Sequence, residues 1–238
     1  MSDQLRLERS DAVLRVQIDA GRGNLFTPEM AAELTALLQT PPDGVHVVHL
    51  SASGPEFCMG RAPFRSGPGP MSEDVAGLVA VNRALLHSPA VTVAEVQGDA
   101  AGFGVGLVVH SDVAVASPEA RFSFPEVHSG FAPALVLAWL GPLVGRRKAF
   151  WLTATGVQLP AREACDLGLV THVADTPDDL AAAVSSSIEL LMSKPPEVHR
   201  DIKRLSRFYA ALPDGARDEV AADRLVLGAL RRAADRSA

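Results

Sequence analysis

Three short segments of the chain carry residue types suited to forming and protonating an enolate. Two of them, residues 57–61 and 96–106, place glycines directly after an apolar strand-like run. Glycine lets backbone N–H groups approach a ligand closely, and a helix N-terminus adds free N–H donors and partial positive charge. The third segment, residues 121–126, ends on the carboxylate of Glu126. Two N–H donors for an oxyanion and one carboxylate to move a proton are the minimum set for enolate chemistry.

Each of these residues also has a purely structural explanation. A glycine-rich turn between a strand and a helix is equally well explained by tight helix–strand packing. Asp99 is better explained as a turn carboxylate that binds nearby N–H groups. His128 lies two residues after Glu126, so an extended chain would put both side chains on one face, although a rim histidine is the simpler explanation. His110 is expected to be a packed helix residue, and Cys58 lacks an evident partner base.

The periodicity of the chain predicts the elements that must position these segments. Residues 5–9 and 13–18 alternate apolar and polar side chains, as half-buried strands do, whereas 45–50, 90–96 and 112–116 are apolar core strands. Thr27 caps a helix that has proline at its first position. Alternating strands and helices predict a parallel sheet with ligands at the strand C-termini. All three candidate segments follow strands, so they can converge.

Composition favours a soluble enzyme with one sizeable core. The chain has 238 residues, 47% of them hydrophobic, and a formal net charge of −6 from 22 basic and 28 acidic residues. This balance argues against a nucleic-acid partner, and no apolar run is long enough to cross a membrane. The N-terminus shows no secretion segment, which predicts a cytoplasmic location. Cys58 and Cys165 lie far apart without metal-type spacing, so both are expected to be reduced thiols and no metal site is expected.

Six motifs in the expected order resemble the enoyl-CoA hydratase/isomerase, or crotonase, superfamily. They lie at residues 23–30, 57–61, 96–112, 122–126, 159–170 and 194–203. The resemblance implies an α/β fold, a crotonase-like spiral of ββα units over residues 1–192, followed by a C-terminal helical trimerisation region over 193–238. It further implies a homotrimer or hexamer that acts on an acyl-CoA or acyl-carrier thioester, with coenzyme A as part of the substrate and no separate cofactor.

The resemblance also assigns roles to residues. It implies that the backbone N–H groups of Arg61 and Phe103 form the oxyanion hole and that Glu126 is the general acid/base. The residues expected to bind substrate are Met59, Gly60, Gly102, Asn24 and Lys203. The Arg61 guanidinium either meets an anionic group on the substrate or is a solvated loop arginine. The breaker-rich residues 65–72 are expected to form a loop, either a flap over the acyl pocket or a plain exposed connection.

One departure from the family pattern bears directly on the reaction. The second glutamate of the family's hydratases falls at Gly106, which has no side chain. A single glutamate can still shuttle a proton between two carbons of an enolate, so the sequence favours double-bond isomerisation. Three alternatives stay open. They are a weak enoyl-CoA hydratase, a polyketide-type decarboxylase or dehydratase suggested by the apolar residues 130–140, and a thioester-binding scaffold without activity.

Overall fold

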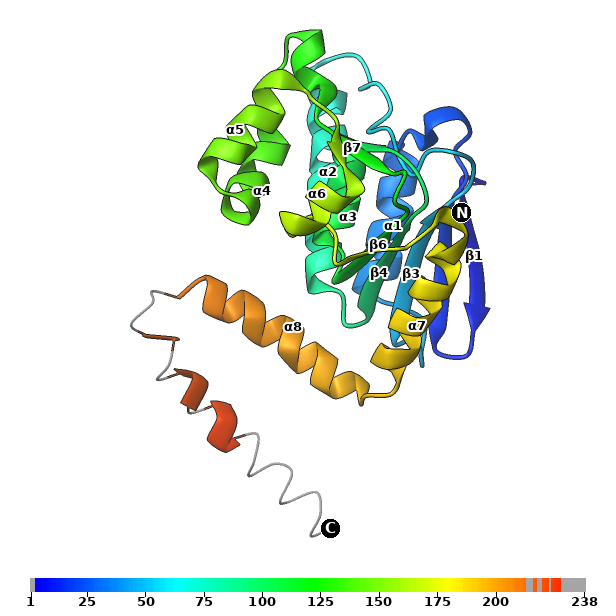
Figure 1. Ribbon diagram of the computed structural model, residues 1–238, viewed down its shortest axis with the longest axis vertical. Helices are drawn as coiled ribbons and strands as arrows, with labels where there is room; N and C mark the ends of the chain where they lie inside the picture. The colour runs from blue at the N-terminus through cyan, green and yellow to red at the C-terminus, as the bar shows by residue number, and fades with distance from the viewer. Residues whose placement is uncertain (1–2, 213–215, 218–219, 223, 228–238) are drawn as a thin grey trace. The chain divides into compact units, whose positions relative to one another are not determined.

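The computed structural model describes residues 3–212, 216–217, 220–222 and 224–227 (Figure 1). The chain divides into two compact units, Met1–His199 and Arg200–Ala238, and each is described by itself. A domain boundary after residue 192, expected from the sequence, stays a prediction.

The first unit is built on a six-stranded sheet with the order β1-β2-β3-β4-β6-β9. The strands are β1 (Leu5–Ser10), β2 (Val13–Ile18), β3 (Val47–Ala52), β4 (Val91–Val96), β6 (Val113–Ala116) and β9 (His172–Val173). β1 and β2 form an antiparallel hairpin, and the other neighbouring strands pair in parallel. The mainly parallel sheet expected from the periodicity is therefore confirmed, with each core strand within two residues of its predicted position.

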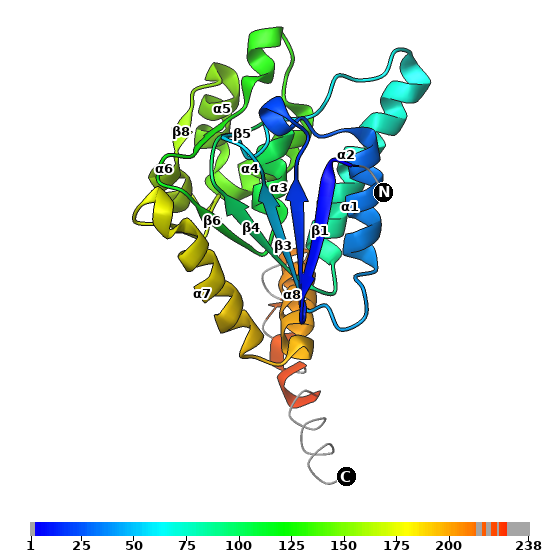
Figure 2. The same cartoon turned by 90° about the vertical axis from the view of Figure 1, so that its right-hand side faces the viewer.

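Helices cover both faces of this sheet (Figure 2). On one face lie α1 (Pro28–Gln39), α2 (Pro68–His87) and α3 (Phe103–His110), and on the other lies α7 (Leu180–Met192). The valines of β3, β4 and β6 that point to α7 pack against Leu180 and Val184. The opposite face forms the larger core, so parallel strands buried on both sides account for the continuous apolar runs in the sequence.

A second, three-stranded sheet stands beside the first, with the order β5-β7-β8. Its strands are β5 (Ala100–Ala101), β7 (Arg121–Ser123) and β8 (Leu159–Pro160). The remaining elements are η1 (Arg22–Asn24), η2 (Pro125–Ser129), α4 (Ala134–Val144), α5 (Arg146–Thr155), α6 (Ala161–Asp166), η3 (Pro177–Asp179) and α8 (Pro196–Ala210). No helix in the described ranges is both long enough and apolar enough to span a membrane.

Local chemistry explains where the helices begin. The Thr27 hydroxyl accepts a hydrogen bond from the Met30 N–H, and Pro28 occupies the first turn of α1, as predicted. The expected loop over residues 65–72 is wrong in its second half, because α2 already begins at Pro68. The buried Asp74 of α2 accepts hydrogen bonds from both the backbone N–H and the Nε of Arg65, at 2.9 and 2.8 Å. These bonds tie the preceding loop to the helix and stabilise the early start.

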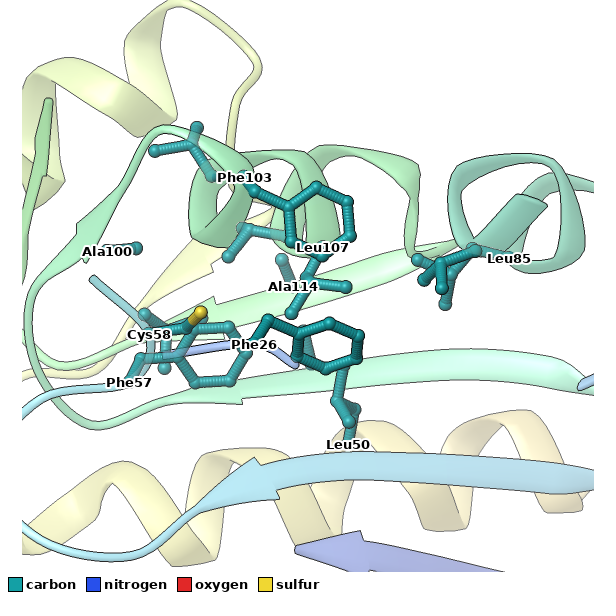
Figure 3. Close-up of a cluster of buried hydrophobic side chains, with 14 of the residues drawn as sticks. Phe26, Leu50, Phe57, Cys58, Leu85, Ala100, Phe103, Leu107 and Ala114 are labelled. Carbon is teal, nitrogen blue, oxygen red and sulfur yellow. The ribbon is translucent and has the colours of Figure 1, made fainter. Parts of the chain in front are cut away.

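Two loops approach each other so closely that no side chain fits between their backbones. A β-carbon at Gly104 would lie 2.0 Å from the Cys58 carbonyl oxygen, and one at Gly98 would lie 1.8 Å from the Pro55 oxygen. Backbone hydrogen bonds fill this contact, since the Phe57 N–H donates to the Asp99 oxygen at 3.0 Å. Figure 3 shows the buried side chains of Phe57, Cys58, Ala100 and Phe103 within one cluster, with α3 beside the sheet.

We predict that Gly104→Ala destabilises the protein by about 3 kcal/mol or more, because its methyl group would overlap the Cys58 carbonyl. The matched control is Gly141→Ala in α4, where a β-carbon would meet nothing within 4 Å. The control should change stability by at most about 1 kcal/mol, in the stabilising direction, because alanine favours a helix over glycine. Urea unfolding curves of the three proteins measure both effects, and equal midpoints for Gly104→Ala and wild type would contradict the close approach.

Candidate functional site

The first N–H donor belongs to Arg61, in the loop after β3. A short parallel bridge joins Phe26 to this loop, because the Phe26 N–H donates to the Gly60 oxygen at 2.9 Å and the Ala62 N–H donates to the Phe26 oxygen at 2.8 Å. The bridge therefore uses the groups on either side of Arg61. Within the described part of the chain the Arg61 N–H has no acceptor, which leaves it available to a ligand. Gly60 adopts a φ of 114°, a conformation that glycine supplies readily.

Asn24 holds this loop in place. Its Oδ1 accepts a hydrogen bond from the Ala20 N–H, and its Nδ2 donates to the backbone oxygens of Ser53 and Glu56, both at 2.8 Å. The side chain is 1% exposed, and all three bonds are to backbone. We expected Asn24 to touch the substrate, but the structure commits its amide to positioning the first loop. Met59 belongs to the same loop, and its N–H donates to the Gly23 oxygen at 2.7 Å. Its contact with substrate stays a prediction.

The second N–H donor belongs to Phe103, the first residue of α3. The first N–H groups of a helix have no intrahelical acceptor, and no described residue supplies one for Phe103. Its ring packs against that of Phe26, with the centroids 5.2 Å apart, as the two labelled rings in Figure 3 show. Phe26 therefore supports both candidate donors, through its backbone for the first loop and through its ring for the second.

Glu126 lies in η2, directly after β7, and its carboxylate stands against Gly102. A β-carbon at residue 102 would lie 2.8 Å from Glu126 Oε1, so a side chain here would shift the carboxylate, and the φ of 50° also favours glycine. The Gly102 N–H donates to the Ser123 oxygen at 2.9 Å, which fixes the start of α3 to β7, the strand that precedes Glu126. Glu126 Oε2 is buried and has no hydrogen-bond partner in the part of the chain that the structure describes. The structure thus brings Gly102, Phe103 and Glu126 together, as predicted.

Burial raises the pKa of Glu126 above its ordinary value, while a hydrogen bond from its own backbone N–H and the positive charge of Arg61 act in the opposite direction. A raised pKa suits a group that must both take and return a proton near neutral pH.

The Arg61 guanidinium lies close enough to interact electrostatically with both Glu126 and Asp74. Its guanidinium stacks on Phe64, with Cζ 3.3 Å from the ring centroid, and Nη1 donates to the Ala62 oxygen.

The structure excludes two other candidates for proton transfer. His128 is exposed at the rim, as the simpler explanation predicted, because η2 is helical there and the His128 ring lies against Gly156. Asp99 accepts a hydrogen bond from the Arg121 N–H at 3.0 Å, so it ties the turn to β7. Neither side chain therefore has the contacts that would let it replace a second glutamate.

Two further residues have structural roles. Cys58 is fully buried, and burial raises the pKa of its thiol to about 12, which keeps it protonated and unreactive. His110 is buried in α3, with Nδ1 2.7 Å from the Gly106 oxygen, as a packed helix residue.

An apolar cavity of about 610 Å³ opens beside η2. It lies between η2 and the helices α4 and α5, and its lining includes Val127, Phe131, Leu137, Phe150 and Thr153. Val127 follows Glu126 in the chain, but Glu126 itself is not one of the residues that line the cavity. Sequence reasoning missed this feature, because residues that line a cavity have the same apolar character as residues that fill a core.

Gly106, the position of the family's second glutamate, and Lys203 lie on different helices. Gly106 is buried in α3, and a β-carbon there would lie 3.6 Å from Asn82 Oδ1, an ordinary contact distance. Asn82, on α2, was not among the predicted site residues. Lys203 is a half-buried residue of α8, in the second unit, and its contact with substrate stays a prediction.

Comparisons with known proteins identify the family of this chain. The family described as enoyl-CoA hydratase/isomerase matches residues 8–236. Cyclohexa-1,5-dienecarbonyl-CoA hydratase of Thauera aromatica is 28% identical over 180 residues, which cover 74% of this chain and 69% of that protein. The 1,2-epoxyphenylacetyl-CoA isomerase of Escherichia coli is 32% identical over 165 residues, or 65% and 63% of the two chains. The crystal structure of an enoyl-CoA hydratase from Mycobacterium smegmatis superposes with a TM-score of 0.89 at 25% identity, covering 95% of this chain and 91% of that one.

The raised pKa of Glu126 predicts a pH-dependent effect of Glu126→Gln on stability. Because the folded state binds the proton more tightly than the unfolded chain, the stability that Glu126 contributes is present below its ordinary pKa of 4.5 and is lost as the pH rises through its folded-state pKa. Glutamine does not titrate, so the variant should gain stability relative to wild type between about pH 4 and pH 8.

Urea unfolding at a series of pH values measures this difference. The exposed substitution Glu119→Gln is the control and should follow wild type at each pH. A difference between Glu126→Gln and wild type that stays constant over the whole range would contradict the raised pKa.

Proposed function

The chain belongs to the enoyl-CoA hydratase/isomerase family, and we propose that it is an acyl-thioester enzyme that moves a double bond along the acyl chain through an enolate. The observation that carries this proposal is the single carboxylate of Glu126 against Gly102, one residue before the open Phe103 N–H. The names of its relatives contain both hydratases and an isomerase, so the residues of the site must decide between the reactions.

In the proposed reaction the two backbone N–H groups act on the thioester oxygen. As Glu126 removes a proton from the carbon next to the carbonyl, the electron pair of the C–H bond moves into an enolate. The N–H groups of Arg61 and Phe103 stabilise the negative oxygen because they are already oriented and need no reorganisation. Glu126 then returns the proton to the far carbon of the conjugated system, which completes the shift of the double bond without loss or gain of atoms.

Gly106 is the reason to favour isomerisation over hydration. Hydration requires one group to orient and deprotonate water and another to handle the proton on carbon. The position that supplies the second glutamate in the family's hydratases has no side chain here, and Asp99 and His128 are engaged elsewhere. The enoyl-CoA hydratase reaction is the second candidate, since relatives carry that name, and we expect it to be slow.

The surroundings of Glu126 support an acyl substrate. The cavity of about 610 Å³ beside η2 is lined mainly by apolar side chains and is large enough for an acyl chain. The partly exposed guanidinium of Arg61, held over Phe64, is placed to meet an anionic group of a thioester. We propose acyl-CoA as the thioester and a homotrimer or hexamer as the assembly, with the helical region 193–238 contributing to it.

We predict that the wild-type protein in heavy water incorporates deuterium into a 3-enoyl-CoA and converts it to the conjugated isomer. Mass spectrometry of the thioesters after incubation measures both changes. Glu126→Gln keeps the size of the side chain but cannot take up a proton, so both rates should fall by about 100-fold or more. Unchanged exchange in this variant would remove Glu126 from the mechanism.

The same incubation with 2-enoyl- and malonyl-type thioesters separates the alternatives. Net addition of water by wild type would show that the protein is a hydratase, and loss of carbon dioxide would favour a decarboxylase. No change in any CoA thioester would favour a carrier-protein substrate or a binding role.

Gly106→Glu should raise water addition about 10-fold or more above Gly106→Gln, which has the same length without the charge. Equal rates for these two variants would contradict the explanation based on Gly106.

A further inference from the structure

A second buried oxygen in the site region has no hydrogen-bond partner. Oδ1 of Asn82 is inaccessible to solvent and, like Glu126 Oε2, is bonded to no described residue. Buried amide oxygens in folded proteins are nearly always hydrogen-bonded, and an unsatisfied one lowers stability. Neither the fold nor the proposed proton transfer gives Asn82 a role, so its position calls for a ligand.

The core-facing residues of α2 around Asn82 are apolar. It lies on α2 next to Val81, and Val81, Leu78 and Leu85 of the same helix are all buried in the core. An apolar side chain at residue 82 would match these neighbours and would leave no polar atom unsatisfied. If Asn82 served only to pack the core, its buried amide oxygen would lower the stability of the protein relative to an apolar side chain.

The amide faces the place of the absent side chain of residue 106. A β-carbon at Gly106 would lie 3.6 Å from Oδ1 and 4.0 Å from Nδ2 of Asn82, and 3.9 Å from the Phe103 ring. The Gly106 N–H donates to the Gly102 oxygen at 3.3 Å, so the two glycines are one helical turn apart. Since a turn advances about 5.4 Å, the Asn82 amide and the Glu126 carboxylate stand against positions of α3 that are one turn apart.

We propose that Asn82 binds a hydroxyl-type oxygen, from the acyl chain or from water, beside Gly106. This proposal rests on the proposed thioester function and names the substrate class that the site selects. An amide both accepts and donates, which complements an O–H group, whereas an aliphatic chain satisfies neither atom and a carboxylate has no hydrogen for Oδ1. Asn82 is neutral and takes no proton, so it acts by binding and selecting the substrate and leaves proton transfer to Glu126.

Calorimetric titration of the full-length protein with 3-hydroxybutyryl-CoA and butyryl-CoA tests this proposal. Wild type should bind the hydroxylated thioester about 5- to 10-fold more tightly, the effect of one neutral hydrogen bond. Asn82→Leu, which keeps the approximate size, should lose this preference while binding butyryl-CoA within about twofold of wild type. Asn82→Ala is the second variant, and Arg83→Gln, at the exposed neighbouring position of α2, is the control and should keep the preference.

The source of the oxygen is identified by a parallel measurement of water addition to 2-butenoyl-CoA. Loss of the binding preference supports an acyl hydroxyl, and loss of water addition in Asn82→Leu supports a bound water. If both properties survive in Asn82→Leu and Asn82→Ala, the proposal for Asn82 is overturned while the thioester function stands. If wild type binds neither thioester, the proposed function fails, and this proposal fails with it.

Discussion

The site depends on one steric constraint, the direct contact between two backbone segments that leave no space for a side chain. Gly98 and Gly104 meet the carbonyl oxygens of Pro55 and Cys58, and backbone hydrogen bonds join the two loops along this contact. Arg61 lies at the end of the first of these loops, and Phe103 lies at the end of the second, where α3 begins. Backbone hydrogen bonding and sterics therefore hold both loops in place, as the oxyanion hole that we propose would require.

The same lack of side chains makes room for the carboxylate that we propose as the general acid/base. Gly102 allows the Glu126 carboxylate to stand against the start of α3, where burial raises its pKa. Glu126 Oε2 is buried without a hydrogen-bond partner among the described residues, which lowers stability, and we propose that the carboxylate is retained for proton transfer. Gly106, one turn further along α3, leaves the site with a single carboxylate, and Asn82 offers a neutral amide in the place where a second acid would stand. The chemistry of the site thus follows from which positions lack a side chain.

Much of this arrangement could be predicted from the sequence, because strands, caps and glycine turns have local signals. The apolar runs gave the core strands and Thr27 marked the start of α1. The start of α2 was missed because it depends on a contact between Arg65 and Asp74 that periodicity does not encode. The favoured rim position of His128 is confirmed, whereas the extended segment considered for residues 126–128 is a single proline-led helical turn. Asn82 gave no sequence signal, since only the folded structure shows that its Oδ1 is buried without a partner among the described residues.

The central claim is that the backbone N–H groups of Arg61 and Phe103 polarise a thioester carbonyl independently of Glu126. Isotope-edited infrared spectroscopy of a bound thioester, labelled with ¹³C at its carbonyl carbon, tests this most directly. The account predicts that the carbonyl stretch moves to lower frequency on binding, in wild type and equally in Glu126→Gln, because both donors belong to the backbone. A bound carbonyl with the same frequency as the free thioester would contradict it.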